Sequence, residues 1–209
     1  MKNQTTKPLD WAKLLTNEAR LTDIVAANDI AAKYQLPVAS VWKALSRLGD
    51  RGLVSRVSKG IYVNKLVRDN SPLDFVSVLK PNSYVSLESA LSDSGLSTQT
   101  PVTLTCVTLG KPKEYKTSEF TIAFRTISKQ LFWGFVEKQT RYSTYKIAEP
   151  EKALLDWIYL SLQGGLTPYL DEIEFKRIDK QKLVKYADKF PNTVRNILVR
   201  SLAFEHFAA

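Results

Sequence analysis

Residues 37–63 read PVASVWKALSRLGDRGLVSRVSKGIYV, and this stretch changes halfway along from a helical pattern to a strand pattern. Pro37 suits the first turn of a helix, because an amide hydrogen there would have no partner within the helix. At about 100° per residue, a helix over residues 37–50 places its apolar side chains on one face and its basic side chains opposite. The apolar face comprises Val41, Ala44, Leu45 and Leu48, and the opposite face comprises Ser40, Lys43, Arg47 and Asp50.

Two short segments rich in β-branched residues follow this helix. They read LVSRV and GIYV, and the Ser-Lys pair before Gly60 predicts a hairpin turn between them. On the N-terminal side, Asp10 and Asn28 are each placed to cap a short amphipathic helix. Three helices followed by a hairpin is the order of a winged helix-turn-helix domain, which we predict for residues 1–68.

A second, larger domain is predicted over residues 72–209, after the polar segment NKLVRDNSP, which ends in proline. Four segments rich in β-forming residues predict a mostly antiparallel sheet. Pro150 begins a helix that is apolar nearly all round, so we expect other elements to cover it. The predicted fold class is therefore α+β, with helices packed around this sheet. The predicted strands cover 102–109, 119–127, 130–137 and 143–148, and the remaining helices cover 74–80, 85–96, 179–190 and 192–207.

Positive charge is concentrated in the N-terminal third of the chain. Of the 209 residues, the first 70 carry 12 of the 30 lysines and arginines but only 6 of the 21 aspartates and glutamates. Between Lys33 and Arg68 there are eight basic residues, and Asp50 is the single acidic one. Because a local field selects partners more than net charge does, this excess favours a polyanionic partner, most often nucleic acid.

The basic face of the helix over residues 37–50 is the candidate DNA-binding site. An α-helix fits the major groove, where its exposed side chains reach base edges and phosphates. We predict that Ser40, Lys43 and Arg47 contact bases or adjacent phosphates, with Ser46 beside them. Positive charge continues from the helix end into the hairpin, where side chains can hold the phosphate backbone. These further predicted contacts are Arg51, Arg56 and Lys59.

Trp42 lies between the two faces of the same helix. Its direction is about 60° from that of Leu45, given about 100° per residue. We therefore expect Trp42 to pack against the hairpin or the first helix rather than to contact DNA.

Residues suited to catalysis or to disulfide bonding are sparse. The only histidine, His206, lies near the end of the sequence, and the only cysteine, Cys106, lies on a predicted strand, where burial is the usual outcome. A single cysteine excludes an internal disulfide and agrees with a reducing compartment. No apolar run approaches the roughly 20 residues of a membrane helix, and no secretory signal precedes the first helix. We predict a cytoplasmic protein without membrane contact.

Two groups of carboxylates offer the only other candidate chemistry. Paired carboxylates can hold a divalent metal for phosphoryl chemistry. However, negative charge in the first turn of the helix at Pro150 also complements the helix dipole. We therefore predict no enzyme activity, no cofactor and no metal site. The first group comprises Glu149, Glu151 and Asp156, and the second comprises Asp171, Glu172 and Glu174.

Several segments of the chain resemble a known family. The expected winged helix, SYVSLESALSDSGLSTQTP, EFTIAFRTI, FWGF and IAEPEKALLDWIYL together resemble the AbiEi-family antitoxins, the antitoxin half of type IV toxin–antitoxin pairs in abortive infection. The resemblance covers nearly the whole chain. Its most specific parts are the S-AL--SGL and A-EPEKALLD segments. We expect EKALLD to serve the fold, because Ala153, Leu154 and Leu155 form its apolar side.

The resemblance implies a bacterial DNA-binding transcriptional autorepressor and antitoxin. Its recognition helix (37–50) and basic wing (53–63) would bind double-stranded inverted repeats in its own promoter, with two copies on one operator. The larger domain would neutralise a nucleotidyltransferase-like toxin, without forming a stable complex with it.

Two alternatives remain open from the residues. The first is a metal-dependent enzyme that processes nucleic acid, with the carboxylates of the larger domain as metal ligands. The second is an interaction module whose basic face binds an acidic partner such as a toxin, without specific DNA binding.

Overall fold

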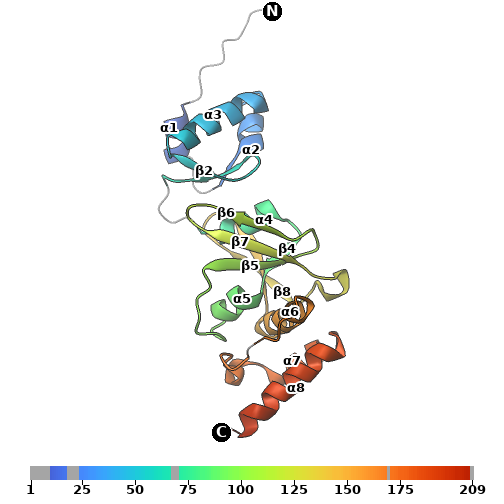
Figure 1. The fold of residues 1–209 in the computed structure, drawn as a ribbon. Helices are drawn as coiled ribbons and strands as arrows, with labels where there is room; N and C mark the ends of the chain where they lie inside the picture. The colour runs from blue at the N-terminus through green and yellow to red at the C-terminus, as the bar shows by residue number, and fades with distance from the viewer. Residues whose placement is uncertain (1–9, 18–23, 67–70, 169, 208–209) are drawn as a thin grey trace, which may run out of the picture. The chain divides into compact units, whose positions relative to one another are not determined.

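The computed structural model describes residues 10–17, 24–66, 71–168 and 170–207. The chain divides into two compact units, Met1–Asp74 and Phe75–Ala209 (Figure 1). The fold is α+β, with eight α-helices and two β-sheets among the described residues. Residues 64–72 are the predicted linker, and 67–70 of them lie outside the described residues.

The first unit contains the helices α1 (Trp11–Asn17), α2 (Ala27–Lys33) and α3 (Val38–Asp50). Asp10 caps α1 as predicted, because its Oδ1 accepts a hydrogen bond from the amide of Lys13 at 3.1 Å. The prediction that Asn28 caps α2 is wrong, since the helix already begins at Ala27 and its N-cap residue, Ala26, has no side chain that could cap it. Instead, the amide of Ala27 donates to the carbonyl of Gly60 at 2.7 Å. A tertiary contact thus satisfies a donor at this helix end.

A tight turn joins α2 to α3. Gln35 has φ of 52°, in the left-handed region. The amide of Leu36 donates back to the carbonyl of Ala31 at 2.9 Å, which closes the end of α2. Pro37 then occupies the N-cap position of α3 with extended dihedral angles. This turn therefore fixes the direction in which α3 leaves α2.

A small antiparallel sheet completes the first unit. Its strands are β1 (Ile24–Ala26), β2 (Val54–Ser58) and β3 (Ile61–Asn64), in the order β1-β3-β2. The predicted hairpin is confirmed as β2 and β3. The sequence did not predict β1, because three residues are too few to show strand periodicity. Asn64 is buried and donates to the carbonyl of Leu15 at 2.8 Å, which ties β3 to α1.

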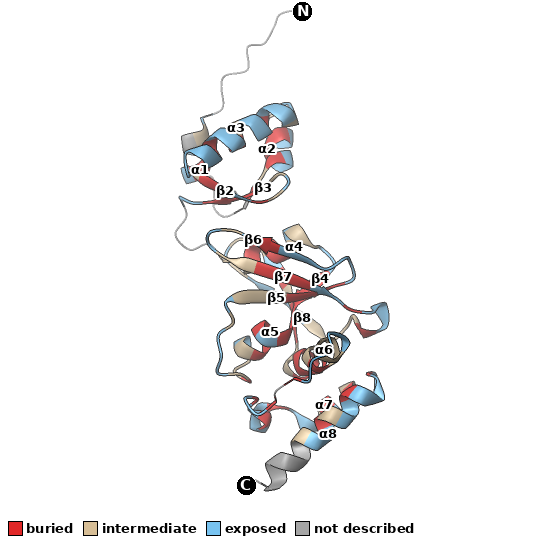
Figure 2. Cartoon of the chain, viewed as in Figure 1, coloured by how far each residue is buried: buried red, intermediate tan, exposed pale blue. Residues whose placement is uncertain are grey.

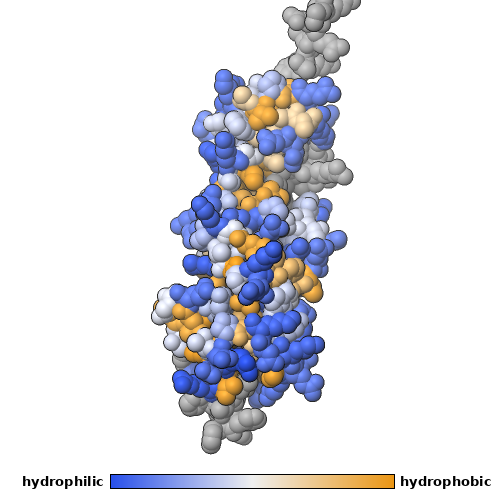
Figure 3. All heavy atoms as spheres, turned by 90° about the vertical axis from the view of Figure 1, so that its right-hand side faces the viewer, coloured by the Kyte–Doolittle hydropathy of each residue, from blue (hydrophilic) through white to orange (hydrophobic). Residues whose placement is uncertain are grey.

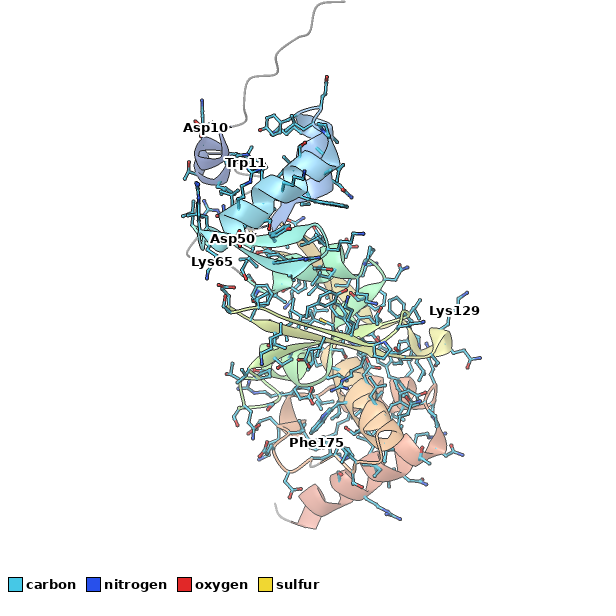
Figure 4. The ribbon with its side chains drawn as sticks, turned by 45° about the horizontal axis from the view of Figure 1, so that its top comes forward. Asp10, Trp11, Asp50, Lys65, Lys129 and Phe175 are labelled. Carbon is cyan, nitrogen blue, oxygen red and sulfur yellow. The ribbon has the colours of Figure 1, made fainter. Side chains whose placement is uncertain are left out.

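The core of the first unit lies between its helices and the sheet (Figure 2). Trp11 packs against this core from α1 and points toward α3 in Figure 4. The apolar face of α3 is buried as predicted at Val41, Leu45 and Leu48, whereas Ala44 is half-buried. Burial of three such side chains stabilises the unit by several kcal/mol, at about 1.5–3 kcal/mol each.

The second unit contains a six-stranded sheet in the order β6-β7-β5-β4-β9-β8. Three neighbouring pairs are antiparallel and two are parallel, so the prediction of a mostly antiparallel sheet holds only in part. The chain leaves β5, forms the edge strand β6 and returns to place β7 between them, which makes β5 and β7 parallel. The strands are β4 (Ser83–Val85), β5 (Thr103–Thr108), β6 (Lys113–Lys116), β7 (Thr121–Thr126), β8 (Phe135–Gln139) and β9 (Thr144–Ala148).

Three differences from the predicted strands have local causes. β4 has only three residues, and β6 reads KEYK, a polar edge strand without apolar alternation. The strand predicted over 130–137 is wrong in its first half, where the 3-10 helix η1 (Lys129–Leu131) lies instead. Gly134 has φ of 73° and redirects the chain before β8 begins.

Helices cover both faces of this sheet (Figure 1). α5 (Leu87–Asp93) and α6 (Pro150–Gln163) lie on one face, and α4 (Leu73–Leu79) lies on the other. α7 (Lys180–Ala187) and α8 (Asn192–Phe207) cover α6 from outside. The prediction for α6 is confirmed at its start, where Pro150 begins the helix, and along Ala153, Leu154, Leu155 and Ile158, which are buried. The apolar side chains of its second half, from Trp157 to Leu162, are only half-buried, apart from Ile158.

Short segments and the outer surface complete the second unit. Phe175 of η2 (Phe175–Arg177) points into the unit, whereas Lys129 points away from it (Figure 4). On the face drawn in Figure 3, hydrophobic residues lie in small groups among hydrophilic ones. No described helix is both long enough and apolar enough to cross a membrane.

Candidate nucleic-acid interface

The outer face of α3 carries four of the seven residues predicted to contact DNA. The other three follow at its C-cap, on β2 and in the hairpin turn. All seven are exposed, whereas the opposite side of α3 packs on the core (Figure 2). The seven are Ser40, Lys43, Ser46, Arg47, Arg51, Arg56 and Lys59.

The positive charge of this face is not neutralised by ion pairs within the described part of the chain. Among the described residues, neither Lys43 nor Arg47 has an ion-pair partner, although they lie one helical turn apart. Part of the charge has a local role, because Arg47 and Arg51 lie where the negative end of the helix dipole favours cations. That role does not require Lys43, which lies in the first half of the helix.

The hairpin turn contacts α3 through Trp42. Of the two predicted packing partners, the hairpin and the first helix, the structure shows the hairpin, although the Trp42 side chain remains 38% exposed. Gly60 has φ of 77°, and a Cβ atom there would lie 3.6 Å from Nε1 of Trp42. The ammonium of Lys59 lies over the indole ring, 5.4 Å from its centroid. Because Ala27 also binds Gly60, the tip of the hairpin is fixed to both α2 and α3.

β2 is an edge strand of the small sheet and carries Arg56 on its exposed side. The Nε atom of Arg56 donates to the carbonyl of Ser58 at 3.2 Å, where the pairing of β2 with β3 shifts register. This bond orients the guanidinium along the strand. The guanidinium has five N–H donors, and this bond uses only the one on Nε. The four on the two terminal nitrogens are left to bind a partner.

The arrangement can bind a polyanion. It combines the hydroxyls of Ser40 and Ser46 with ammonium and guanidinium groups. All of these can donate hydrogen bonds to phosphate oxygens. Most of these groups come from one rigid helix and one fixed turn. Little backbone freedom therefore has to be lost on binding.

The structure does not gather the carboxylates of the second unit into one site. Glu149 binds Lys182 at 2.7 Å, and Glu151 binds the same ammonium at 3.2 Å. Asp156 lies elsewhere, in the buried core. The described part of the chain holds no group of three His, Cys, Asp or Glu residues that could bind a metal ion. Asp171, Glu172 and Glu174 are exposed.

A buried polar cluster around Lys152 is the main feature that the sequence analysis missed. Lys152 and Asp156 form an ion pair one turn apart on α6, and both side chains are 0% exposed. The hydroxyls of Tyr84 and Ser86 donate to Asp156 at 2.8 and 2.9 Å. Lys152 also donates to the Tyr84 hydroxyl at 2.9 Å. The available signal was a pair of opposite charges spaced i, i+4 in an otherwise apolar helix.

Aromatic rings enclose the ammonium of this cluster. Its Nζ lies 5.2 Å from the ring centroid of Trp133 and 5.3 Å from those of Tyr84 and Phe190. Gly134 makes room for the stem of Lys152, because a Cβ atom there would lie 3.0 Å from its Cγ. The FWGF and EPEKALLD segments, distant in sequence, thus meet at one residue.

Burial sets the ionisation of the groups in this core. It lowers the pKa of Lys152 and raises the pKa of Asp156, and their mutual attraction opposes both effects. Burial and the adjacent carboxylate also raise the pKa of the Tyr84 hydroxyl far above its ordinary range. Cys106 is fully buried as predicted, and burial raises the pKa of its thiol well above the ordinary value. These groups are structural, since none reaches solvent.

Comparison with known proteins adds no family to this description. Neither the scan against models of protein families nor the search of curated proteins finds a match for this chain. The function proposed below therefore rests on the residues of the chain itself and on the segments they form.

Proposed function

We propose that this protein is a DNA-binding transcriptional autorepressor and the antitoxin of a type IV toxin–antitoxin pair. In this proposal the first unit is a winged helix-turn-helix, with α3 as the recognition helix and the β2–β3 hairpin as the wing. The observation that carries the proposal is the basic face of α3, whose Lys43 and Arg47 have no ion-pair partner among the described residues, beside a hairpin fixed to the same helix.

In the proposed complex, α3 lies in the major groove of double-stranded DNA. Side chains near the start of a recognition helix reach base edges, which suits Ser40 and Lys43. Arg47 reaches a base edge or an adjacent phosphate. Arg51, Arg56 and Lys59 contact the phosphate backbone, where Arg and Lys provide position rather than sequence discrimination.

Two copies bind one operator. One helix reads a half-site of only a few base pairs, so an inverted repeat needs two recognition helices, about 34–36 Å apart for sites one helical turn apart. The operator is expected upstream of the gene itself.

The antitoxin role is proposed for the second unit and is supported by the resemblance of its segments to AbiEi-family antitoxins. The partner is a nucleotidyltransferase-like toxin. The proposal includes no stable complex between the two proteins.

Salt dependence of DNA binding tests the first half of the proposal. Fluorescence anisotropy with the upstream promoter duplex measures affinity over a range of salt concentrations. Each phosphate neutralised contributes a slope of about −0.9 in log affinity against log salt. Five or six contacts predict a steep loss of affinity, whereas a flat response would exclude the proposed interface.

A pair of matched variants localises the binding. Arg47→Ala is expected to weaken operator binding by roughly 1–3 kcal/mol if the side chain reads a base, and by less if it meets only a phosphate. Lys13→Ala removes an equally exposed cation from α1 and is expected to change affinity little. Equal losses in both variants would indicate unspecific attraction to net charge.

A further inference from the structure

The second unit contains a small pocket that the proposed DNA contact does not use. It lies between α5, α6 and two loops, and its volume is about 110 Å³. The loops are joined by a bridge between Ser97 and Ile173, and the amide of Glu174 donates to the carbonyl of Leu96 at 2.9 Å. The walls of the pocket are therefore held by backbone bonds as well as by the two helices.

The pocket has an apolar floor and an acidic rim. Leu91 and Ile173 form buried parts of its lining, and Trp157 of α6 is half-buried beside them. Glu88 and Glu172 are the two charged residues that line it, and both are exposed. Among the described residues, neither carboxylate has an ion-pair partner.

Size and charge together restrict the occupant. Sites for metabolites and cofactors have volumes of about 300–1,000 Å³, so this pocket is on the scale of one side chain. Two unpaired carboxylates exclude an anion and favour a cation. The protein as a whole carries a net charge of +9, so attraction of a cation here is a local property of the pocket.

An arginine side chain matches the apolar floor, the indole ring and the two carboxylates of this lining. Its methylene stem can contact the apolar floor, and its guanidinium can stack on an indole ring, the aromatic ring that favours cations most. The planar N–H fork also matches carboxylate geometry, and Arg is enriched where protein interfaces have their strongest contacts.

We propose that this pocket receives an arginine side chain of a partner protein, and that the second unit uses it as the anchor of a protein interface. The pocket lies in segments that the sequence analysis singled out, since Gln99 and Pro101 belong to SGLSTQTP and Trp157 follows EKALLD. The inference goes beyond the proposed function and does not depend on DNA binding.

The test uses the full chain and capped amino acids as probes. The protein has four tryptophans, and Trp157→Phe identifies the indole N–H signal of Trp157 in the ¹H–¹⁵N spectrum. Nα-acetyl-arginine N-methylamide is expected to shift this signal in a saturable way. The citrulline analogue, which has the same shape without charge, is expected to bind at least about tenfold more weakly.

Variants establish that the rim carboxylates are responsible. Glu88→Gln combined with Glu172→Gln is expected to weaken binding of the arginine probe to the level of the citrulline analogue. The control, Glu114→Gln combined with Glu137→Gln, changes net charge equally at exposed positions outside the pocket and is expected to bind as the wild type. Both double variants are expected to keep wild-type operator affinity, so the outcome is independent of the DNA proposal.

Three results would overturn the inference. These are no saturable shift of the Trp157 signal, equal affinity for the citrulline analogue, and unchanged affinity in the pocket variant. Titrations with free arginine and with spermidine test whether the cation belongs to a protein or is a free small molecule. If either binds more tightly than the capped residue, the pocket takes a free small cation and the protein-partner assignment is wrong.

Discussion

At the scale of single residues, Lys152 is the most constrained side chain of the second unit. It is fully buried, and Asp156, also fully buried, depends on it for charge compensation. Lys152→Met keeps most of the apolar volume but leaves Asp156 without its counter-charge. We expect this variant to lower the free energy of unfolding by about 3–5 kcal/mol, measured by urea denaturation.

A second substitution separates lost charge balance from lost packing. In Lys152→Met combined with Asp156→Asn, a neutral amide oxygen can still accept from Tyr84 and Ser86. We expect the double variant to be more stable than Lys152→Met by about 1 kcal/mol or more. If the double variant is no more stable than Lys152→Met, the destabilisation comes from packing alone.

Gly134 offers a test of the close approach to Lys152. With φ of 73°, any other residue is strained there by roughly 1–3 kcal/mol, and its Cβ would lie 3.0 Å from the lysine Cγ. Gly165 has the same φ but nothing within 4 Å of its Cβ position. We expect Gly134→Ala to lower the melting temperature clearly more than Gly165→Ala does. Equal shifts would mean that the Lys152 stem moves aside without cost.

At the scale of elements, the junction of α6 and α7 is held by a carboxylate. Glu149, at the N-cap of α6, accepts hydrogen bonds from Lys182 at 2.7 Å and from Tyr186 at 2.6 Å. Burial by itself raises the pKa of Glu149, but these bonds outweigh it, so the folded-state pKa lies below the ordinary 4.5. Burial by itself lowers the pKa of Lys182, but the contacts of its ammonium with Glu149 and Glu151 outweigh burial and raise that pKa.

The sign of the pH dependence follows from the lowered pKa of Glu149. Its contribution to stability is present above the unfolded-state value of about 4.5 and is lost as pH falls through the lower folded-state value. Glu149→Gln is therefore expected to lose less free energy of unfolding between neutral and acidic pH than the wild type. Glu114→Gln, at an exposed position on β6, is the control, and its stability should change with pH as that of the wild type does. Identical urea midpoints for all three proteins at low pH and at neutral pH would contradict this assignment.

At the scale of the whole molecule, the proposed function distributes two activities over two units. Arg47→Ala changes only the exposed face of α3, so it should weaken repression of a promoter reporter in proportion to its loss of operator affinity. Protection of cells against the proposed toxin should remain. A variant that lost both activities together, with unchanged melting temperature, would show that the two activities share one surface.

Local patterns in the sequence determined the elements whose signal is long and periodic. The amphipathic helix α3 has 13 residues and the apolar helix α6 has 14, and the hairpin lies within residues 54–64. Each of these lengths is roughly that of a window in which periodicity can be read. The exposed basic side chains of α3 followed from the same period, because burial of one helical face leaves the opposite face to solvent.

Only the tertiary structure decided what depends on contacts between distant segments. Tyr84 and Asp156, which share a hydrogen bond, are 72 residues apart in the sequence. Strands that follow one another in sequence usually pair in that order, but here β7 lies between β5 and β6 and runs parallel to β5. The hydrogen bond from the Ala27 amide to the Gly60 carbonyl and the acidic pocket beside Trp157 arise in the same way. The physical reason is that side-chain periodicity reports which face of an element is buried, whereas the partner on that face is chosen by packing and charge compensation across the fold.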